Sequence, residues 1–180
     1  DITIAEIARQ AGAVIIERPA ELASDISPEW LSWRHGIEWV ENHYGRFECF
    51  VSLPATSPLR DVSDVEGAIA KLKSSLADIC ISVTPASRSP YFNMVKVLDD
   101  ETCELVIKPD GTVTRRQDAP DVFDITTVVY IATPEFIENN DSMFSGKVTS
   151  VVVPKERAVD IDDIYDFLLA EAIVSGIKNE

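Results

Sequence analysis

Residues 47–83 read FECFVSLPATSPLRDVSDVEGAIAKLKSSLADICISV. Two apolar runs in this stretch, Phe47–Leu53 and Asp78–Val83, have the length and composition of short buried strands. Between them, Ser63-Asp64-Val65-Glu66 has the form of a capping box and predicts a helix that continues to about Leu76. Short strands that alternate with amphipathic helices are typical of α/β folds, so this stretch decides the fold class.

The same alternation continues on both sides of this stretch. Before it, the sequence predicts a helix over Ile2–Ala11 that ends at Gly12, a buried strand over Ala13–Ile16, and a helix over Pro28–Asn42. After it, the sequence predicts strands over Ile125–Ile131 and Val148–Val153 and a closing helix over Ile161–Ile173. We therefore expect residues 1–180 to form a single three-layer α/β domain around a mixed, largely parallel sheet.

Residues of about 86–124 interrupt this pattern, because they show turn residues and no helical period. Met94–Leu98 and Leu105–Ile107 predict a hairpin, and Asp110-Gly111 predicts a turn. We expect this segment to leave the core as an arm. Its apolar positions have no covered partner within the segment, so we expect the arm to pack on a second subunit and make a homodimer.

The composition bounds the class of protein. With 46% apolar and 26% charged residues among 180, the chain is an ordinary globular domain. Its net charge of −15 argues against nucleic acid as a partner, because such a surface needs a basic face. No apolar run approaches the ~20 residues of a membrane span, so we expect no membrane partner. Cys49, Cys80 and Cys103 lie widely spaced in apolar runs, which predicts buried thiols in the reducing cytoplasm.

Two carboxylates follow the predicted strand Val148–Val153. Asp160 and Asp162 are two residues apart, so in extended chain they point the same way and can face one magnesium ion. Binding by two carboxylates and by substrate phosphates is the usual arrangement of magnesium in phosphate chemistry. The alternative is that Asp162 or Asp163 caps the closing helix, and the two roles can coexist.

A hydroxyl-rich turn, Thr56-Ser57-Pro58-Leu59-Arg60, follows the predicted strand Phe47–Leu53. Open α/β sheets bind ligands at the carboxyl ends of their strands. Thr56 and Ser57 can therefore bind the ribose or base of a nucleotide, and Arg60 can contact phosphate or hold the turn. The alternative is a proline-stiffened turn that only leads into the next helix.

Further candidate residues lie outside these two motifs. Arg115-Arg116-Gln117 offers planar guanidinium groups suited to a carboxylate substrate, although adjacent arginines are more often solvated surface residues. Tyr130 and Phe144 either belong to the core or stack on a sugar. The two histidines have no acidic partner at ligand spacing, and the sequence contains neither a Ser-His-Asp pattern nor a Gly-rich phosphate loop.

These motifs together resemble those of the N-acylneuraminate cytidylyltransferases over nearly the whole chain. Arg18-Pro19 is similar to an arginine-proline element that contributes to the family's CTP pocket, and Leu53–Arg60 to its strand-turn motif, with Thr56 near the nucleotide. Arg115–Pro120 is similar to the Arg-Arg-Gln-Asp-x-Pro segment whose second arginine, here Arg116, reaches the sugar acid.

The later motifs extend the resemblance. Ser89-Pro90-Tyr91 is similar to the start of the arm that crosses to a partner subunit, Tyr130 and Phe144 to the aromatic residues of the sugar site, and Asp160 and Asp162 to the metal ligands. The resemblance implies a Rossmann-like fold of the nucleotide-diphospho-sugar transferase type. It also implies an enzyme that joins CTP to a nonulosonic acid, uses Mg²⁺ and releases pyrophosphate. The implied nucleotide-binding residues are Arg18, Thr56 and Ser57, and the implied substrate-binding residues are Arg116, Gln117, Tyr130 and Phe144.

The sequence departs from the family pattern in two places. The family's nucleotide loop, of the Ala-Arg-x-Gly-Ser-Lys type, precedes its first strand, whereas this chain opens at Asp1-Ile2-Thr3-Ile4. We therefore expect the chain as given to lack the triphosphate loop and to be inactive. The positions that line the sugar side of the family's site also carry residues that differ from those common in sialate enzymes, namely Pro54, Asp124, Thr126 and Thr127. Legionaminate, pseudaminate or a deaminated acid is therefore as good a candidate substrate as N-acetylneuraminate. The alternative function is a non-catalytic dimeric fragment or sugar-binding module.

Overall fold

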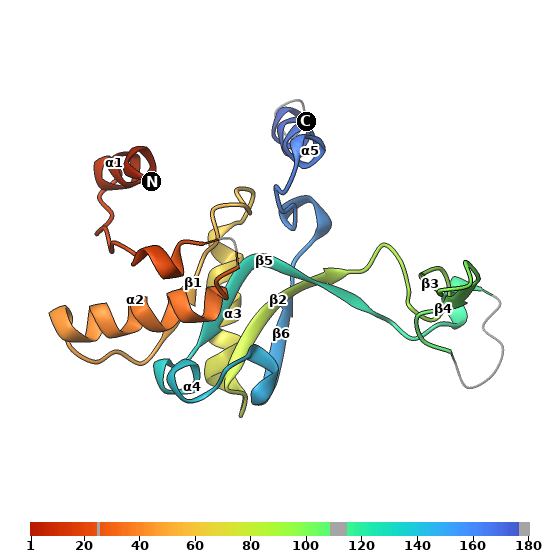
Figure 1. Cartoon of the computed structure of the whole chain (residues 1–180), viewed down its shortest axis with the longest axis horizontal. Helices are drawn as coiled ribbons and strands as arrows, with labels where there is room; N and C mark the ends of the chain where they lie inside the picture. Colours follow the sequence, from red (N-terminus) through yellow and green to blue (C-terminus); the bar gives the residue numbers. More distant parts are fainter. Residues whose placement is uncertain (25, 109–114, 177–180) are drawn as a thin grey trace.

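A four-stranded mixed sheet forms the centre of the computed structural model, which describes residues 1–24, 26–108 and 115–176 (Figure 1). Its strands are β1 (Phe50–Ser52), β2 (Ile79–Pro85), β5 (Phe123–Ala132) and β6 (Val148–Val152), in the order β1-β5-β2-β6. β2 is parallel to β6, whereas β5 is antiparallel to both β1 and β2. The sheet is mixed as predicted. The expectation of largely parallel strand pairing is wrong, because β5 lies between β1 and β2 and is antiparallel to both.

Helices cover both faces of the sheet, which gives the three layers that the sequence predicted. On one face, α2 (Glu29–Tyr44) and α4 (Pro134–Asn139) pack through Trp30, Trp33 and Phe136. On the other face, α3 (Val62–Ser74) packs through Ala68 and its apolar neighbours. Each large side chain buried in this way contributes about 1.5–3 kcal/mol relative to exposure, so the two clusters account for most of the hydrophobic stabilisation of the core.

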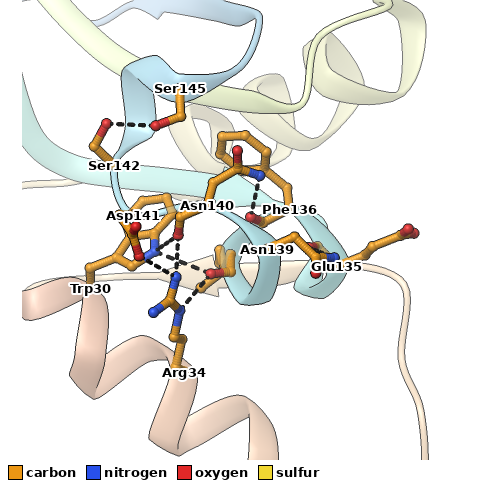
Figure 2. A network of polar contacts seen from close by, with 10 residues as sticks. Trp30, Arg34, Glu135, Phe136, Asn139, Asn140, Asp141, Ser142 and Ser145 are labelled. Carbon is orange, nitrogen blue, oxygen red and sulfur yellow. Dashed lines mark hydrogen bonds and ion pairs between the residues drawn. The ribbon is translucent and has the colours of Figure 1, made fainter.

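A polar network joins α2 to the end of α4 (Figure 2). The indole nitrogen of Trp30 donates to the carbonyl oxygen of Ile137 at 3.1 Å and also to that of Asn140. Arg34 donates to the same two carbonyls, and pairs with Asp141 at 2.9 Å. The last carbonyls of a helix have no partner within it, so α2 here satisfies the carboxyl end of α4 and fixes the chain that leads to β6.

β5 contains a bulge at its centre. Ile81 of β2 pairs with Tyr130, but Ser82 pairs with Thr126, so residues 127–129 have no direct partner on β2. The buried hydroxyl of Ser82 accepts hydrogen bonds from the amide of Val129 at 3.0 Å and from the hydroxyl of Thr126 at 2.8 Å. It also lies 3.0 Å from the carbonyl oxygens of Thr126 and Val129, to either of which it can donate. One side chain thus satisfies the backbone that the bulge would otherwise leave unpaired.

The arm leaves the sheet after β2 and returns to it at β5 (Figure 1). It carries a two-stranded antiparallel ribbon of β3 (Val95–Val97) and β4 (Cys103–Leu105). Glu104 pairs with Lys96 at 2.7 Å and with Lys108 at 2.6 Å. The ribbon turns between β3 and β4, where Glu101 has a φ of 64°, and the predicted turn at Asp110-Gly111 lies outside the described residues.

Three predictions about elements are wrong in detail. Ala13–Ile16 is not a strand, and Val14 is 60% exposed, because no strand among the described residues pairs with this segment. Asp61, and not Ser63, caps α3: its side chain accepts from the amide of Ser63, and Asp64 completes the capping box. Cys103 is exposed and Cys49 only half-buried, whereas Cys80 is fully buried and burial raises its pKa to about 11.

A helix lies near each end of the described chain and stands apart from the sheet (Figure 1). α1 (Ile2–Gln10) ends just before Gly12, whose φ is 90°. β1 is shorter than the predicted Phe47–Leu53, and α5 (Ile164–Gly176) begins three residues after the predicted Ile161. Within the described part of the chain, none of the helices combines the length and apolar character needed to cross a membrane.

Candidate active site

Two segments meet at the edge of the sheet where β1, β2 and β6 end. The first is the turn after β1, residues 54–60, and the second is the loop after β6, residues 154–163. The backbone amide of Ile161 donates a hydrogen bond of 2.9 Å to the carbonyl oxygen of Thr56. This bond brings the hydroxyl-rich turn and the Asp-Ile-Asp sequence together at the carboxyl ends of strands with a common direction, which is where open α/β sheets bind ligands.

Internal hydrogen bonds hold the turn in place. Ser57 is fully buried, and its hydroxyl oxygen lies 2.6 Å from that of Thr127 in the β5 bulge. Arg60 donates to the carbonyl oxygen of Pro54 and, at 3.4 Å, to that of Thr127, and burial lowers its pKa. Thr56 is exposed. Ser57 and Arg60 therefore stabilise the turn in this structure, and Thr56 is the hydroxyl that it presents to solvent.

The carboxylates of the second segment divide into two pairs with different contacts. Asp163 accepts hydrogen bonds from the amides of Tyr165 at 2.7 Å and Asp166 at 3.1 Å, and Asp166 accepts from the amides of Asp162 and Asp163, both at 3.1 Å. Asp163 and Asp166 thus cap α5 reciprocally. In the described structure the side chains of Asp160 and Asp162 make none of these capping bonds.

Asp160 has the environment expected of a ligand for a cation. One of its carboxylate oxygens is buried and has no hydrogen-bond partner among the described residues. A buried oxygen without a partner costs about 1–3 kcal/mol, which a bound cation would offset. Asp162 is exposed beside it. Among the described residues, no group of three or more His, Cys, Asp or Glu side chains is placed to hold a metal; two carboxylates fit magnesium only if substrate and water supply the other oxygens.

An ion pair also joins the second segment to α3, the helix that follows the first segment. Arg157 donates to both carboxylate oxygens of Asp64, from Nε at 2.9 Å and from Nη2 at 2.8 Å. Arg157 belongs to the loop after β6, and Asp64 to the first turn of α3, which directly follows the hydroxyl-rich turn. The sequence did not reveal this pair, because no local pattern relates positions so far apart in the chain.

The predicted aromatic residues lie in different surroundings. Tyr130 is 7% exposed, its ring centroid lies 5.5 Å from that of Trp33, and burial followed by the charges of Glu29 and Asp160 raises its pKa. Phe144 is 64% exposed and precedes β6, whereas Asp160 follows β6, so the two residues lie beyond opposite ends of that strand. The structure of one chain does not bring Phe144 to the turn and loop described above.

Arg18 and Arg116, two further predicted site residues, belong to other parts of the chain than these two segments. Arg18 is exposed and donates to the hydroxyl of Ser32 on α2 at 3.2 Å. Arg116 and Gln117 lie in a short 3₁₀ helix on the arm, Arg116–Asp118, and the side chain of Arg116 is outside the described set. Arg115 forms an exposed two-bond pair with Asp118, at 2.9 and 2.8 Å. Any contact of Arg116 with the site of one chain therefore stays a prediction.

Thr126 and Thr127 have structural partners. Thr126 is buried and bonded to Ser82, and Thr127 is bonded to Ser57. Sequence reasoning placed both on the sugar side and did not identify Ser82. The sequence signal that could have identified Ser82 is that it carries the single hydroxyl within the apolar run Ile79–Val83, since a buried hydroxyl needs a partner.

Comparison with known proteins identifies relatives over almost the full chain. It is 32% identical over 178 residues to the CMP-N,N'-diacetyllegionaminic acid synthase of Campylobacter jejuni, which covers 98% of this chain and 74% of that protein. It is 31% identical to the post-translational flagellin modification protein B of Campylobacter coli, over 95% of this chain and 72% of that protein. An N-acylneuraminate cytidylyltransferase of Escherichia coli is 27% identical over 93% of this chain and 38% of its own length.

The fold has a counterpart among solved structures. The 4-diphosphocytidyl-2C-methyl-D-erythritol synthase of Anaerococcus prevotii superposes with a TM-score of 0.60 and 13% identity, over 97% of this chain and 76% of that one. This similarity supports the Rossmann-like fold. No protein-family profile matches the chain. The identity and coverage of the relatives, together with the meeting of the two segments, show that the chain belongs to the family of nonulosonate (N-acylneuraminate-type) cytidylyltransferases.

Proposed function

We propose that this enzyme transfers CMP from CTP to a nonulosonic acid, with the reaction centred between the turn at Thr56 and the loop at Asp160–Asp162. The observation that carries the proposal is the hydrogen bond from Ile161 to Thr56, because it joins the turn that we propose for the nucleotide to the segment that contains Asp160 and Asp162. The names of the relatives support the reaction class.

In the proposed reaction, the anomeric hydroxyl oxygen of the acid forms a bond to the α-phosphorus of CTP. The bond between that phosphorus and the oxygen bridging to the β-phosphate breaks, pyrophosphate leaves, and the hydroxyl proton passes to solvent or a nearby base. Asp160 and Asp162 would hold Mg²⁺, which when bound spreads the negative charge that develops on the phosphate oxygens. Asp160 supports this role through its unpartnered buried oxygen.

The nucleotide would lie against the turn. The exposed Thr56 is the hydroxyl best placed to contact it, and Ser57 would act mainly by holding the turn, because its own hydroxyl is bonded to Thr127. Arg18 would contribute from the segment before α2. These assignments make Thr56→Ala a test of nucleotide binding, with an increase in the Michaelis constant for CTP as the expected result.

The sugar acid would be recognised partly by the arm of a second copy of the chain. The arm carries Arg116 and Gln117, and it extends away from its own sheet (Figure 1). Six large apolar residues on it are at least 40% exposed, namely Met94, Val95, Val97, Leu98, Val106 and Ile107. A two-stranded ribbon is only marginally stable alone, so packing on a partner explains both its order and its apolar surface.

A homodimer built by the arm has a direct test. Val97, 70% exposed on the ribbon, is replaced by aspartate, and the mass in solution is measured by light scattering. The expected result is a dimer for the wild type and a monomer for Val97→Asp, whereas Leu76→Asp, at an exposed position beyond α3, should stay dimeric. A monomeric wild type contradicts the proposed assembly.

The acid is proposed to be of the legionaminate class, since the relative matched over 98% of the chain makes a CMP-legionaminic acid derivative. The experiment measures pyrophosphate release from each of the four nucleoside triphosphates with legionaminate, pseudaminate, N-acetylneuraminate and an octulosonate. Release by the complete enzyme with CTP and a nonulosonate alone is expected. Saturable binding of the acid without release from any triphosphate would instead support a sugar-binding module.

A further inference from the structure

We infer that Asp64 and Arg157 are positioning residues that fix Asp160 and Asp162 relative to the hydroxyl-rich turn at residues 54–60. This inference rests on the function proposed above. Neither side chain belongs to the motifs that the sequence singled out for chemistry. Their pair nevertheless joins the loop after β6 to α3, the helix that directly follows the turn at residues 54–60.

The pair is built as a specific, partly buried contact. The side chain of Asp64 is 5% exposed and that of Arg157 34% exposed. Both nitrogens of the guanidinium edge contact the two oxygens of one carboxylate, a geometry that fixes orientation as well as distance. A buried carboxylate without its cation is strongly unfavourable, so the loop must stay where Arg157 can reach Asp64.

Asp64 has a second contact that sets the pair apart from an ordinary helix cap. Its Oδ2 accepts the backbone amide of Asp61 at 2.9 Å, which completes the capping box of α3. This bond and the bond from the amide of Ser63 to the side chain of Asp61 form the capping box without Arg157. The contact with Arg157 is therefore additional to capping, and what it adds is a link from α3 to the loop after β6.

The contact between Arg157 and Asp64 affects Asp160 because the chain between Arg157 and Asp160 is short and is held on both sides. Two residues separate Arg157 from Asp160, and the first of them, Ala158, packs in the core beneath α3. Before the loop, the amide of Val153 donates to the carbonyl oxygen of Val83 at 2.8 Å; after it, Ile161 is bonded to Thr56. If Arg157 moves, the part of the loop that must move with it is therefore the part around Asp160.

The test uses Arg157→Lys, which keeps the charge but cannot form the two-bond contact, and Asp64→Asn, which keeps an oxygen for the amide of Asp61. The control is Asp141→Asn, which removes an exposed ion pair at the opposite end of the sheet. For each protein we would measure kcat, KM for CTP, the Mg²⁺ concentration that gives half-maximal rate, the affinity for Mn²⁺ with CTP bound (by electron paramagnetic resonance), and the melting temperature.

Both site variants should lower kcat at least tenfold and weaken Mn²⁺ binding at least fivefold, with KM for CTP within about threefold of wild type. The control should match wild type in all of these. A lower melting temperature with unchanged kcat and Mn²⁺ affinity would overturn the inference and leave the pair a purely structural one. If the complete wild-type enzyme releases no pyrophosphate, the proposed function fails, and the Mn²⁺ affinities still decide whether the pair positions the two carboxylates.

Discussion

The amide of Ile161 and the carbonyl oxygen of Thr56 are 2.9 Å apart and join the chain after β6 to the chain after β1. Both partners are backbone atoms, so the contact survives substitution of either side chain by any residue except proline at position 161. The side chain of Thr56 and the carboxylates beside Ile161 therefore stay available for ligands. The predictions below concern the complete enzyme and separate residues that would act on those ligands from residues that hold the site.

Asp160→Asn and Asp162→Asn should each lower turnover at least tenfold, which corresponds to ~1.4 kcal/mol in the barrier. The reason is that an amide binds a divalent cation more weakly than a carboxylate does. The melting temperature should change little, because neither side chain caps α5. Asp163→Ala is the matched comparison: it removes the cap and should cost about 1 kcal/mol of helix stability with turnover nearly unchanged. Equal losses of stability and activity in the two asparagine variants would contradict the metal role.

Arg116→Lys should weaken binding of the sugar acid and leave the Michaelis constant for CTP nearly unchanged. Lysine keeps the charge but reproduces a two-bond contact with a carboxylate poorly. Arg115→Ala should be tolerated, because its guanidinium is exposed and engaged with Asp118 on the same arm. Steady-state kinetics with each substrate varied in turn provide the measurement, and a damaging Arg115→Ala with a silent Arg116→Lys would show that the assignment along the arm is wrong.

Ser82→Ala should lower the free energy of unfolding by about 2 kcal/mol, since it leaves the buried amide of Val129 and hydroxyl of Thr126 without their acceptor. Urea denaturation measures the change. Ser74→Ala, at an exposed position near the end of α3, removes the same atom where water can replace it and should change stability by less than about 0.5 kcal/mol. Equal effects of the two substitutions would mean that the hydroxyl does not support the β5 bulge.

The stabilising effect of Asp64 should disappear at acid pH. Burial raises the pKa of its carboxyl, but hydrogen bonds from Arg157 and from the amide of Asp61 outweigh burial and leave the pKa below its usual range. A carboxyl with a lowered folded-state pKa stabilises the fold above its unfolded-state pKa of about 3.9 and loses that effect as pH falls through the folded-state value. The difference in unfolding free energy between wild type and Asp64→Asn should thus be constant from pH 7 to about pH 5 and shrink below about pH 4. A difference that grows on acidification would refute this.

The elements that the sequence predicted well are those that bury one face. Trp30, Trp33 and Ile37 recur at helical spacing and pack against the sheet, so α2 was predicted almost to its ends. Ala13–Ile16 has equally apolar residues, but a strand also needs a neighbouring strand, which no local pattern supplies. Choosing Asp61 over Ser63 as the cap of α3 likewise depended on tertiary structure, because both residue types are good caps.

The same distinction applies to the site. The turn and the Asp-Ile-Asp sequence were predictable as ends of strands, and the structure brings them together. The contacts that hold them, Arg157 with Asp64 and Ser57 with Thr127, join residues far apart in sequence and follow only from the packed structure. The sequence assigned Phe144 and Tyr130 to the same sugar site. In the structure Tyr130 is buried and Phe144 is exposed, and the length of β6 separates Phe144 from the loop that follows this strand.

The position of the arm between β2 and β5 has a consequence for how the family can diversify. These two strands pair along most of their length although residues 86–122 lie between them in the chain. The entropy of closing a loop grows only with the logarithm of its length, so doubling such a segment costs about 0.6 kcal/mol. Insertions and exchanges in the arm are thus nearly neutral for folding of the sheet. Evolution can rewrite the segment that carries Arg116, and with it the proposed contact with the acid, while the core that would hold the nucleotide stays the same.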